Sequence, residues 1–274
     1  MNKTIIIITI LCCLALLSCS STHIVTDCIP SPTEMATAGG DTVYVWSNAP
    51  DGHQIISIYD NSTSGATLAA GPIAITCMAA APTTLFWADS VGLTALDLAS
   101  SHRSTIPYPD DVTSASDLVV VGDLLLASSV IEGTVYAIDL DNNGAFKDNR
   151  MQPLIDLHGA NLLCYTGNRL FITTPDSTTT STSILVIDDF ATMTPHHFAA
   201  IDSHISAMAA HDDRLFIATA SGIQSIDTSD SSLIEPLDIT LTTPLSTVAD
   251  MTIASDRLYI TDTNNDRIVS VKIK

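Results

Sequence analysis

A repeat of 40 to 45 residues runs through almost the whole of this chain. Six times, an apolar stretch that contains a Met or Leu is followed about eight residues later by a second apolar stretch with an aromatic residue or Leu. The pairs are Met35 with Tyr44, Met78 with Phe86, Leu118 with Leu126, Leu163 with Phe171, Met208 with Phe216, and Met251 with Tyr259. Their second members are 42, 40, 45, 45 and 43 residues apart, a period typical of radially repeated four-stranded sheets. The sequence therefore predicts an all-β protein, a six-bladed β-propeller with four antiparallel strands in each blade.

The strands of single blades follow from turn residues and apolar runs. In the second repeat we expect strands at 75–80, 84–88, 92–98 and 104–108, and in the fifth at 205–210, 214–219, 222–227 and 236–241. The last repeat supplies only three, at 250–254, 257–261 and 267–273. Because an incomplete blade would expose a sheet edge, we expect the β-like stretch 22–29 to pair into this blade and close the ring. The alternative is that 22–29 is an unstructured tether.

The N-terminus has the features of a secretion signal. Lys3 precedes an apolar run over residues 5–17, which is too short to span about 30 Å of hydrocarbon as a helix. The stretch Leu16-Leu17-Ser18-Cys19 resembles the lipobox of bacterial lipoproteins, in which the Cys is acylated and becomes the first residue. The alternatives are an ordinary signal peptide cleaved nearby, or an uncleaved anchor. We therefore divide the chain into a lipoprotein signal peptide (1–18), a lipidated N-terminus with the closing strand (19–33), and the propeller (34–274).

Location and partners follow from this signal and from the charge. Ser20, rather than Asp, follows the Cys, and in the Gram-negative pattern that it resembles this favours the outer membrane. The lipid anchor, palmitate among its acyl chains, would hold the protein on the membrane of a bacterial cell envelope. A formal net charge of −20 repels phosphate backbones, so we expect no nucleic-acid partner. We expect instead a protein, a peptide or a small ligand at one face of the propeller.

Three cysteines follow Cys19 in the sequence, namely Cys28, Cys77 and Cys164. Their spacings match no metal-binding pattern, and two of them fall in predicted inner strands. We interpret them as buried apolar thiols. A disulfide between Cys28 and Cys77 is the alternative in an oxidising compartment.

Two blades carry motifs that resemble known families. Residues 258–268, LYITDTNNDRI, resemble an NHL repeat, and residues 85–90, LFWADS, are similar to the Tyr-Trp-Thr-Asp blade of the LDL-receptor propellers. Both families belong to the six-bladed group that includes the SMP-30/gluconolactonase enzymes. The resemblance implies a six-bladed fold in which the motif Asp caps a turn and the motif Arg packs between blades. It does not imply one function, because the fold hosts binding modules and enzymes alike.

The positions that lead into the inner strands offer a candidate metal site. Oxygen-bearing side chains occur there at Glu34, Asp117, Asn161 and Asp250, and Ca²⁺ or another divalent cation prefers such ligands. The alternative is that each side chain caps a strand or turn at the solvated rim. The resemblance to SMP-30 implies a Glu, an Asn and an Asp as metal ligands, the Asp also acting as general base. Ser116 stands near the expected Asn and Asn161 near the expected Asp, so this chain departs from the enzyme pattern.

Other local patterns predict turns rather than sites. The run 139–144, DLDNNG, begins like a calcium loop, but its twelfth position is Arg150 and not Glu, so we predict a plain β-turn at Asn143-Gly144. The Ser/Thr-rich run 177–183 is predicted to be a solvated loop in blade 4. We find no catalytic motif, such as a Gly-x-Ser-x-Gly sequence or a phosphate loop.

These observations favour a lipid-anchored binding or scaffolding module over an enzyme. A metal-dependent lactonase or hydrolase of the SMP-30 type is the alternative hypothesis, and it depends on the four side chains of the candidate metal site.

Overall fold

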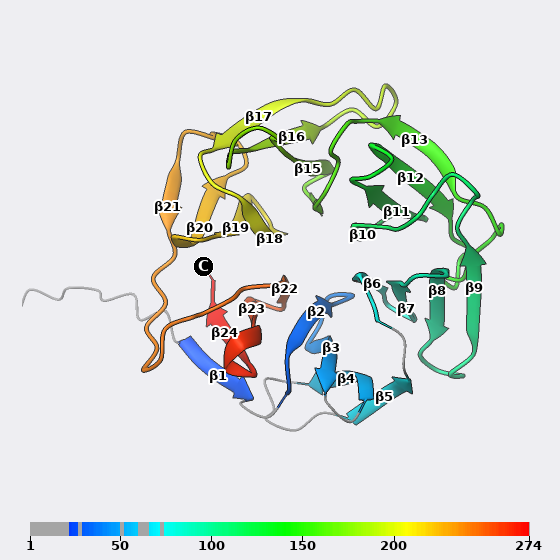
Figure 1. The fold of residues 1–274 in the computed structure, drawn as a ribbon, viewed down its shortest axis with the longest axis horizontal. Coiled ribbons are helices and arrows are strands. Elements are labelled where there is room, and N and C mark those ends of the chain that lie inside the picture. Colours follow the sequence, from blue (N-terminus) through cyan, green and yellow to red (C-terminus); the bar gives the residue numbers. More distant parts are fainter. Residues whose placement is uncertain (1–21, 27–28, 50–51, 60–65, 72–73, 274) are drawn as a thin grey trace, which may run out of the picture.

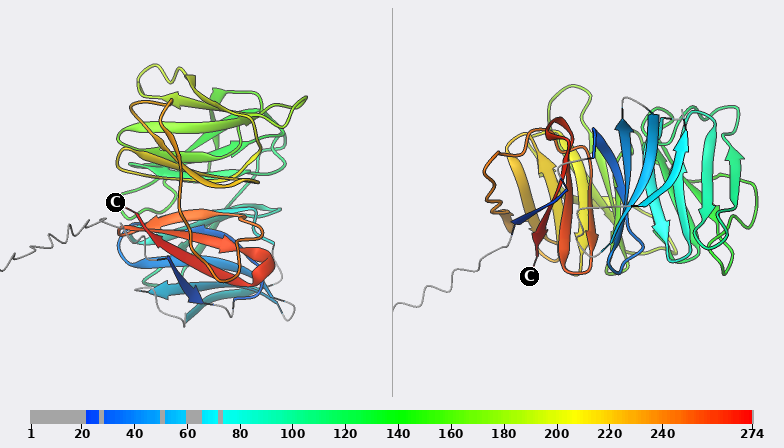
Figure 2. Two further views of the ribbon diagram at one scale, coloured as in Figure 1. Left: turned by 90° about the vertical axis from the view of Figure 1, so that its left-hand side faces the viewer. Right: turned by 90° about the horizontal axis from the view of Figure 1, so that it is seen from below.

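The fold is a ring of six four-stranded antiparallel sheets around a central axis (Figure 1). The computed structural model describes residues 22–26, 29–49, 52–59, 66–71 and 74–273. The predicted signal peptide, the acylated Cys19 and Cys28 lie outside the described residues. Seen edge-on, the strands of each blade run roughly along the ring axis (Figure 2). The predicted six-bladed β-propeller is confirmed.

The blades follow one another in chain order. Blade 1 consists of β2 (Pro32–Ala36), β3 (Thr42–Ala49), β4 (Gly52–Tyr59) and β5 (Ala66–Gly71). Blade 2 consists of β6 (Cys77–Ala81), β7 (Thr84–Ala88), β8 (Gly92–Asp97) and β9 (Arg103–Pro107). Blade 3 consists of β10 (Asp117–Val121), β11 (Leu124–Ser129), β12 (Thr134–Asp139) and β13 (Gln152–Asp156). Blade 4 consists of β14 (Leu163–Thr166), β15 (Arg169–Pro175), β16 (Thr182–Ile187) and β17 (His196–Ile201). Blade 5 consists of β18 (Ile205–His211), β19 (Arg214–Thr219), β20 (Gly222–Asp227) and β21 (Ile234–Pro236). The sixth consists of β22 (Met251–Ala254), β23 (Arg257–Asp262), β24 (Arg267–Lys272) and β1 (Thr22–Thr26).

The N-terminal strand closes the ring, as the incomplete last repeat predicts. β1 pairs antiparallel with β24, with Thr22 opposite Val271 (Figure 2). In β1, Val25 and Thr26 are buried. The paired stretch ends at Thr26, so it is shorter than the predicted 22–29, and blade 1 begins at Pro32 rather than at residue 34. Two hydrogen bonds fix the connection between β1 and β2, from the Ser31 N–H to Asp266 Oδ1 (2.8 Å) and from Thr263 Oγ1 to the Pro32 carbonyl (2.7 Å).

The sequence repeat corresponds to a constant register. In every blade, the residue after the repeated Met or Leu of the inner strand stands opposite the repeated aromatic residue or Leu of the second strand, for example Ala79 opposite Phe86 and Ala209 opposite Phe216. All six repeated inner-strand residues are buried. Small residues such as Ala79 and Ala209 fit the crowded axis, whereas the bulky second-strand residues fill the space between neighbouring sheets.

The outer strand of blade 5 differs from the prediction. The expected strand 236–241 is wrong, because β21 is only Ile234–Pro236 and the chain leaves β20 after the Leu237 N–H donates to the Ile223 carbonyl (2.9 Å). Leu237, Ile239 and Leu241 pack instead on the core between blades 5 and 6. Alternating apolar residues indicate an extended chain, but they do not distinguish a strand of the blade 5 sheet from a segment that packs against the next blade.

The loop of blade 4 is largely as predicted. Residues 176–180 are exposed between β15 and β16, but Thr182 is buried and begins β16. Among the described residues the one helix is the 3₁₀ turn Thr263–Asn265, and no helix is long and apolar enough to cross a membrane.

Removing β1 should destabilise the whole domain. We expect a chain that begins at residue 27 to melt well below one that begins at residue 22, because burying a side chain such as Val25 contributes about 1.5–3 kcal/mol and each kcal/mol shifts Tm by about 2–4 °C. Thermal unfolding followed by circular dichroism measures this difference. Shortening the exposed run 177–180 to two glycines is the control and should change Tm little. Equal melting temperatures for the two N-termini would contradict closure by β1.

Candidate functional site

The inner strands enclose a cavity of about 270 Å³ on the ring axis. Its wall carries one repeated apolar residue from each blade, namely Met35, Met78, Leu118, Leu163, Met208 and Met251. Two carboxylates, Asp117 from blade 3 and Asp250 from blade 6, also line it. Asp117 and Asp250 hold the same position in their blades, because each directly precedes the repeated residue of its inner strand, Leu118 or Met251.

Both carboxylates join neighbouring blades through backbone hydrogen bonds. Asp117 accepts from the N–H of Leu118 in its own strand (2.7 Å) and from the N–H of Leu163 in blade 4 (2.6 Å). Asp250 accepts in the same way from Met251 (2.7 Å) and from Met35 in blade 1 (2.6 Å). In each case one carboxylate oxygen binds its own blade and the other binds the next one. We call these two arrangements the carboxylate clamps.

The clamps and Glu34 share an electrostatic environment. Burial raises the pKa of Asp117 to about 7, although its two backbone hydrogen bonds act in the opposite direction. Burial, then the charge of Asp117, raises the pKa of Asp250 well above its usual range. Burial, followed by the charges of Asp250 and Asp117, does the same for Glu34. The charge of Asp117 therefore opposes the ionisation of Asp250, and both charges oppose that of Glu34.

Asn161 does not share the register of these acids. The residue that precedes Leu163, and so corresponds to Asp117 and Asp250, is Leu162. Asn161 lies one residue earlier, where its N–H donates to the Thr173 carbonyl (2.9 Å) and its carbonyl accepts from the Ser128 hydroxyl. Ser116, at the place of the Asn that the SMP-30 resemblance implies, accepts from the Val130 N–H (3.0 Å) through its hydroxyl.

The structure thus brings together three of the four residues of the candidate metal site, in blades 1, 3 and 6. Within the described part of the chain, no three His, Cys, Asp or Glu side chains are grouped as metal ligands. A cation at this position would compete with the backbone N–H groups for the oxygens of Asp117 and Asp250. The metal site remains a prediction.

The two cysteines that the structure describes are buried free thiols. Burial raises the pKa of both Cys77 and Cys164, and the charge of Asp117 adds to the shift. Thiolates are the reactive form of cysteine, so neither residue is suited to nucleophilic chemistry. Their burial agrees with the apolar role that the sequence indicates, while Cys28 lies outside the described residues.

The Asp-rich loop after β12 is a turn, as predicted. Asp141 Oδ1 accepts from the N–H groups of Asn143 (2.8 Å) and Ala145 (2.9 Å), and Gly144 has a φ of +76°. The Asn143 carbonyl accepts from Thr83 Oγ1 in blade 2 (2.6 Å). The carboxylate therefore shapes the loop, and the loop braces the neighbouring blade.

A second, larger cavity lies where blade 5 meets blade 6. Its volume is about 640 Å³. One wall is the β19–β20 turn and the start of β18; the other is the irregular connection 237–250 between β21 and β22, which we call the strap (Figure 1). We call this cavity the junction groove. The sequence does not reveal this cavity, because the alternating apolar residues of 236–241 predict a strand in the sheet of blade 5.

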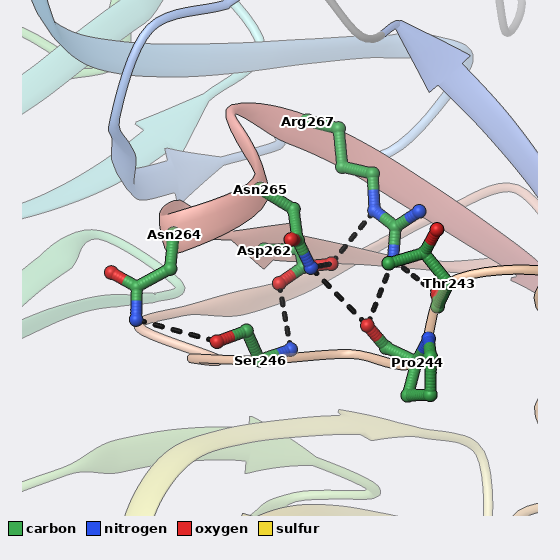
Figure 3. A network of polar contacts seen from close by, with 7 residues as sticks. All are labelled: Thr243, Pro244, Ser246, Asp262, Asn264, Asn265 and Arg267. Atoms are coloured by element: carbon green, nitrogen blue, oxygen red, sulfur yellow. Dashed lines mark hydrogen bonds and ion pairs between the residues drawn. The ribbon is translucent and has the colours of Figure 1, made fainter.

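The NHL-like motif of blade 6 holds the strap in place (Figure 3). Asp262 and Arg267 form a buried ion pair (Nε to Oδ2, 2.7 Å). Arg267 also donates to the carbonyls of Thr243 (2.7 Å) and Pro244 (3.2 Å) in the strap. Asp262 Oδ1 accepts from the Ser246 N–H (2.9 Å). The motif thus has a structural role, with the Asp fixing a turn and the Arg reaching the segment between blades.

Comparisons with known proteins support the fold. No protein-family model matches the chain, and no curated protein matches it. Among solved structures, it is similar to a chain of a nidogen/laminin complex, with 12% identity, coverage of 92% of this chain and 90% of that chain, and a TM-score of 0.63. It is also similar to the computationally designed protein Ika8, with 13% identity, coverage of 86% and 70%, and a TM-score of 0.48. The first likeness shows the β-propeller fold alone.

The half-buried acids Glu34, Asp117 and Asp250 should make stability depend on pH. Because their folded-state pKa values are raised, their favourable contribution is complete below the unfolded pKa values, near 4, and is lost as pH rises through the folded values, about 7 for Asp117. We expect the free energy of unfolding by urea to fall between pH 4.5 and 7.5. Asp117→Asn should reduce the slope by up to about 1.4 kcal/mol per pH unit.

Asp111→Asn is the control for net charge, because this aspartate is exposed on the connection between β9 and β10. It should leave the slope close to that of the wild type. If Asp117→Asn and the wild type share one slope, the Asp117 carboxyl does not titrate in this range, which would contradict a raised pKa for this group.

Proposed function

We propose that this chain is a lipid-anchored β-propeller of a bacterial envelope that acts as a binding or scaffolding module. The observation that carries the proposal is that the clamp carboxylates, Asp117 and Asp250, accept backbone N–H groups with both oxygens. A general base must present a lone pair to the substrate. Carboxylates that join the blades are better suited to fixing a rigid ring, and a rigid ring suits the presentation of a surface to a partner.

The anchor is proposed from the sequence alone. The lipobox-like stretch places the acylated residue at Cys19, and Ser20 favours the outer membrane of a Gram-negative cell. β1 begins at Thr22, so the tether reaches at most about 10 Å. A tether this short would keep the propeller at the membrane surface, with the outer strand of blade 6 nearest to the lipid.

A protein partner is proposed from shape and likeness. The similar propeller belongs to a nidogen/laminin complex, an assembly of proteins, and propeller faces are broad surfaces that suit such contacts. The motif at 258–268 supports grouping this chain with NHL-like propellers. The excess of acidic residues favours a neutral or basic partner, and no nucleic acid.

A metal-dependent lactonase or hydrolase of the SMP-30 type is the second candidate. One observation favours it: the charges of Asp250 and Asp117 raise the pKa of Glu34, the charge of Asp117 raises that of Asp250, and a bound cation would relieve this repulsion. Two observations weigh against a ligand set of the SMP-30 type. Asn161 lies one residue before the position that corresponds to Asp117 and Asp250, and the Ser116 hydroxyl accepts a backbone hydrogen bond from Val130.

The anchor predicts acylation at a single residue. We expect metabolic labelling with radioactive palmitate in a Gram-negative host to be lost in Cys19→Ser and kept in Cys28→Ser, the matched control. Membrane fractionation should show the first variant leaving the outer membrane or persisting as an unprocessed precursor. Palmitate label on Cys19→Ser would assign the acyl group to another residue and refute this anchor.

Metal titration separates the two candidate functions. A cation bound at a hundredfold excess over Kd would add about 2.7 kcal/mol to stability. We expect Tm to change no more in millimolar Ca²⁺, Mg²⁺, Mn²⁺ or Zn²⁺ than in NaCl of equal ionic strength. A rise of several degrees that disappears in Asp250→Asn, but not in the surface control Asp111→Asn, would favour the enzyme over the binding module.

A further inference from the structure

Exposed apolar side chains gather on one edge of the ring. Within the described part of the chain, seven large hydrophobic residues are exposed. Five of them lie in or beside the third and outer strands of three consecutive blades, 5, 6 and 1: Leu233, Ile234, Ile24, Tyr59 and Leu68. These blades meet along the left and lower edge of the ring, where β21, β1 and β5 follow one another (Figure 1). We call the five side chains the apolar rim.

The antiparallel order of the blades places the apolar rim toward one face of the ring. In each blade the third strand ends, and the outer strand begins, at the face where the inner strand ends. Tyr59 is the last residue of β4, and Leu233 directly precedes β21. β1 begins at this face as well, because Thr22 stands opposite Val271 near the end of β24 (Figure 2). We call it the anchor face, and the face where the inner strands begin the open face.

The proposed lipid anchor leaves from the middle of the apolar rim. Cys19 is three residues before Thr22, so its acyl chains are held within about 10 Å of the start of β1. Ile24 lies two residues further along β1, and blade 6 has blade 5 on one side and blade 1 on the other. A bilayer is therefore the surface that acylation at Cys19 brings to the rim.

The charges beside the apolar rim give a bilayer little electrostatic attraction. Lys272 is paired with Asp256 (Nζ to Oδ2, 3.3 Å), and Arg214 with Glu235 (3.8 Å). A net charge of −20 would be repelled by anionic lipids. Contact with lipid would therefore depend on the anchor and on apolar side chains, among which Tyr59 is of the kind enriched at membrane interfaces. Such contact is insensitive to salt, unlike the binding of a basic patch.

We propose that the apolar rim docks on the bilayer that holds the Cys19 acyl chains, so that blades 5, 6 and 1 contact lipid and the open face is turned away from it. Val91 and Ile131, the other two exposed hydrophobic residues of the described chain, lie in turns between second and third strands on the open face. The junction groove includes the corresponding turn of blade 5. The open face is thus the surface left accessible to a partner. The proposal rests on the proposed lipid anchor and adds an orientation to it.

Tryptophan fluorescence tests this docking on the purified acylated protein, in vesicles of phosphatidylethanolamine, phosphatidylglycerol and brominated phosphatidylcholine. The native Trp46 and Trp87 are buried and give a constant background. We expect the added emission of Tyr59→Trp and Leu233→Trp to shift to shorter wavelength and to be quenched by the brominated lipid, in low and high salt alike. Val91→Trp is the matched control and should show neither change, because Val91 is 62% exposed and Tyr59 63%, but on opposite faces.

A second substitution separates contact by the rim from nearness to the anchor. In Leu233→Trp, adding Tyr59→Asp should weaken the quenching, whereas adding Val91→Asp should not. Quenching that Tyr59→Asp leaves unchanged, or quenching at position 91 that equals or exceeds that at position 59, would overturn the proposal.

Flotation of the same vesicles distinguishes failure of the docking from failure of the anchor. Acylated protein that floats with the vesicles but shows no quenching in Tyr59→Trp or Leu233→Trp would refute the docking and leave the anchor intact. Protein that does not float with the vesicles would refute the anchor, and the docking with it.

Discussion

The pairing of β1 with β24 is the contact on which the ring depends, because it joins the two ends of the chain without a covalent link. A propeller that fails to close exposes a sheet edge in its last blade and weakens the junction on each side of it. In this protein the junction is reinforced at three levels. The strand buries Val25, the Ser31 and Thr263 hydrogen bonds fix the linker, and Asp250 binds the Met35 N–H across the same junction near the axis.

The carboxylate clamps also join neighbouring blades, close to the ring axis. Asp250 joins blade 6 to blade 1, and Asp117 joins blade 3 to blade 4, so each acid stabilises a junction between blades. Burial makes their ionised forms unfavourable, and the charge of Asp117 adds to the rise in the pKa of Asp250. Asp117 and Asp250, which the sequence offers as metal ligands, thus accept hydrogen bonds from backbone N–H groups. These hydrogen bonds give both residues a structural role that needs no bound ligand.

The repeat was sufficient to predict the architecture, because one register recurs in all six blades and leaves a periodic trace of Met, Leu and aromatic residues. Closure was predictable as well, since counting strands left one edge unpaired. The strap was not predictable. Its alternation of Leu237, Ile239 and Leu241 is that of a strand, and only the packing of blade 5 against blade 6 decides that these side chains cover the junction. Asn161 was misplaced by one residue for a similar reason: the start of an inner strand depends on cross-strand pairing.

The central claim is that the carboxylate clamps hold the blades together, and hydrogen exchange at single amides tests it most directly. In Asp117→Ala, the Leu163 N–H should exchange at least about tenfold faster than in the wild type, while the Met35 N–H keeps its protection. In Asp250→Ala the pattern should be reversed. Two results would contradict a structural role for the clamps: protection of the Leu163 N–H that survives the loss of Asp117, or an equal loss of protection at both amides in either variant. Asp117 and Asp250 would then be candidate metal ligands only.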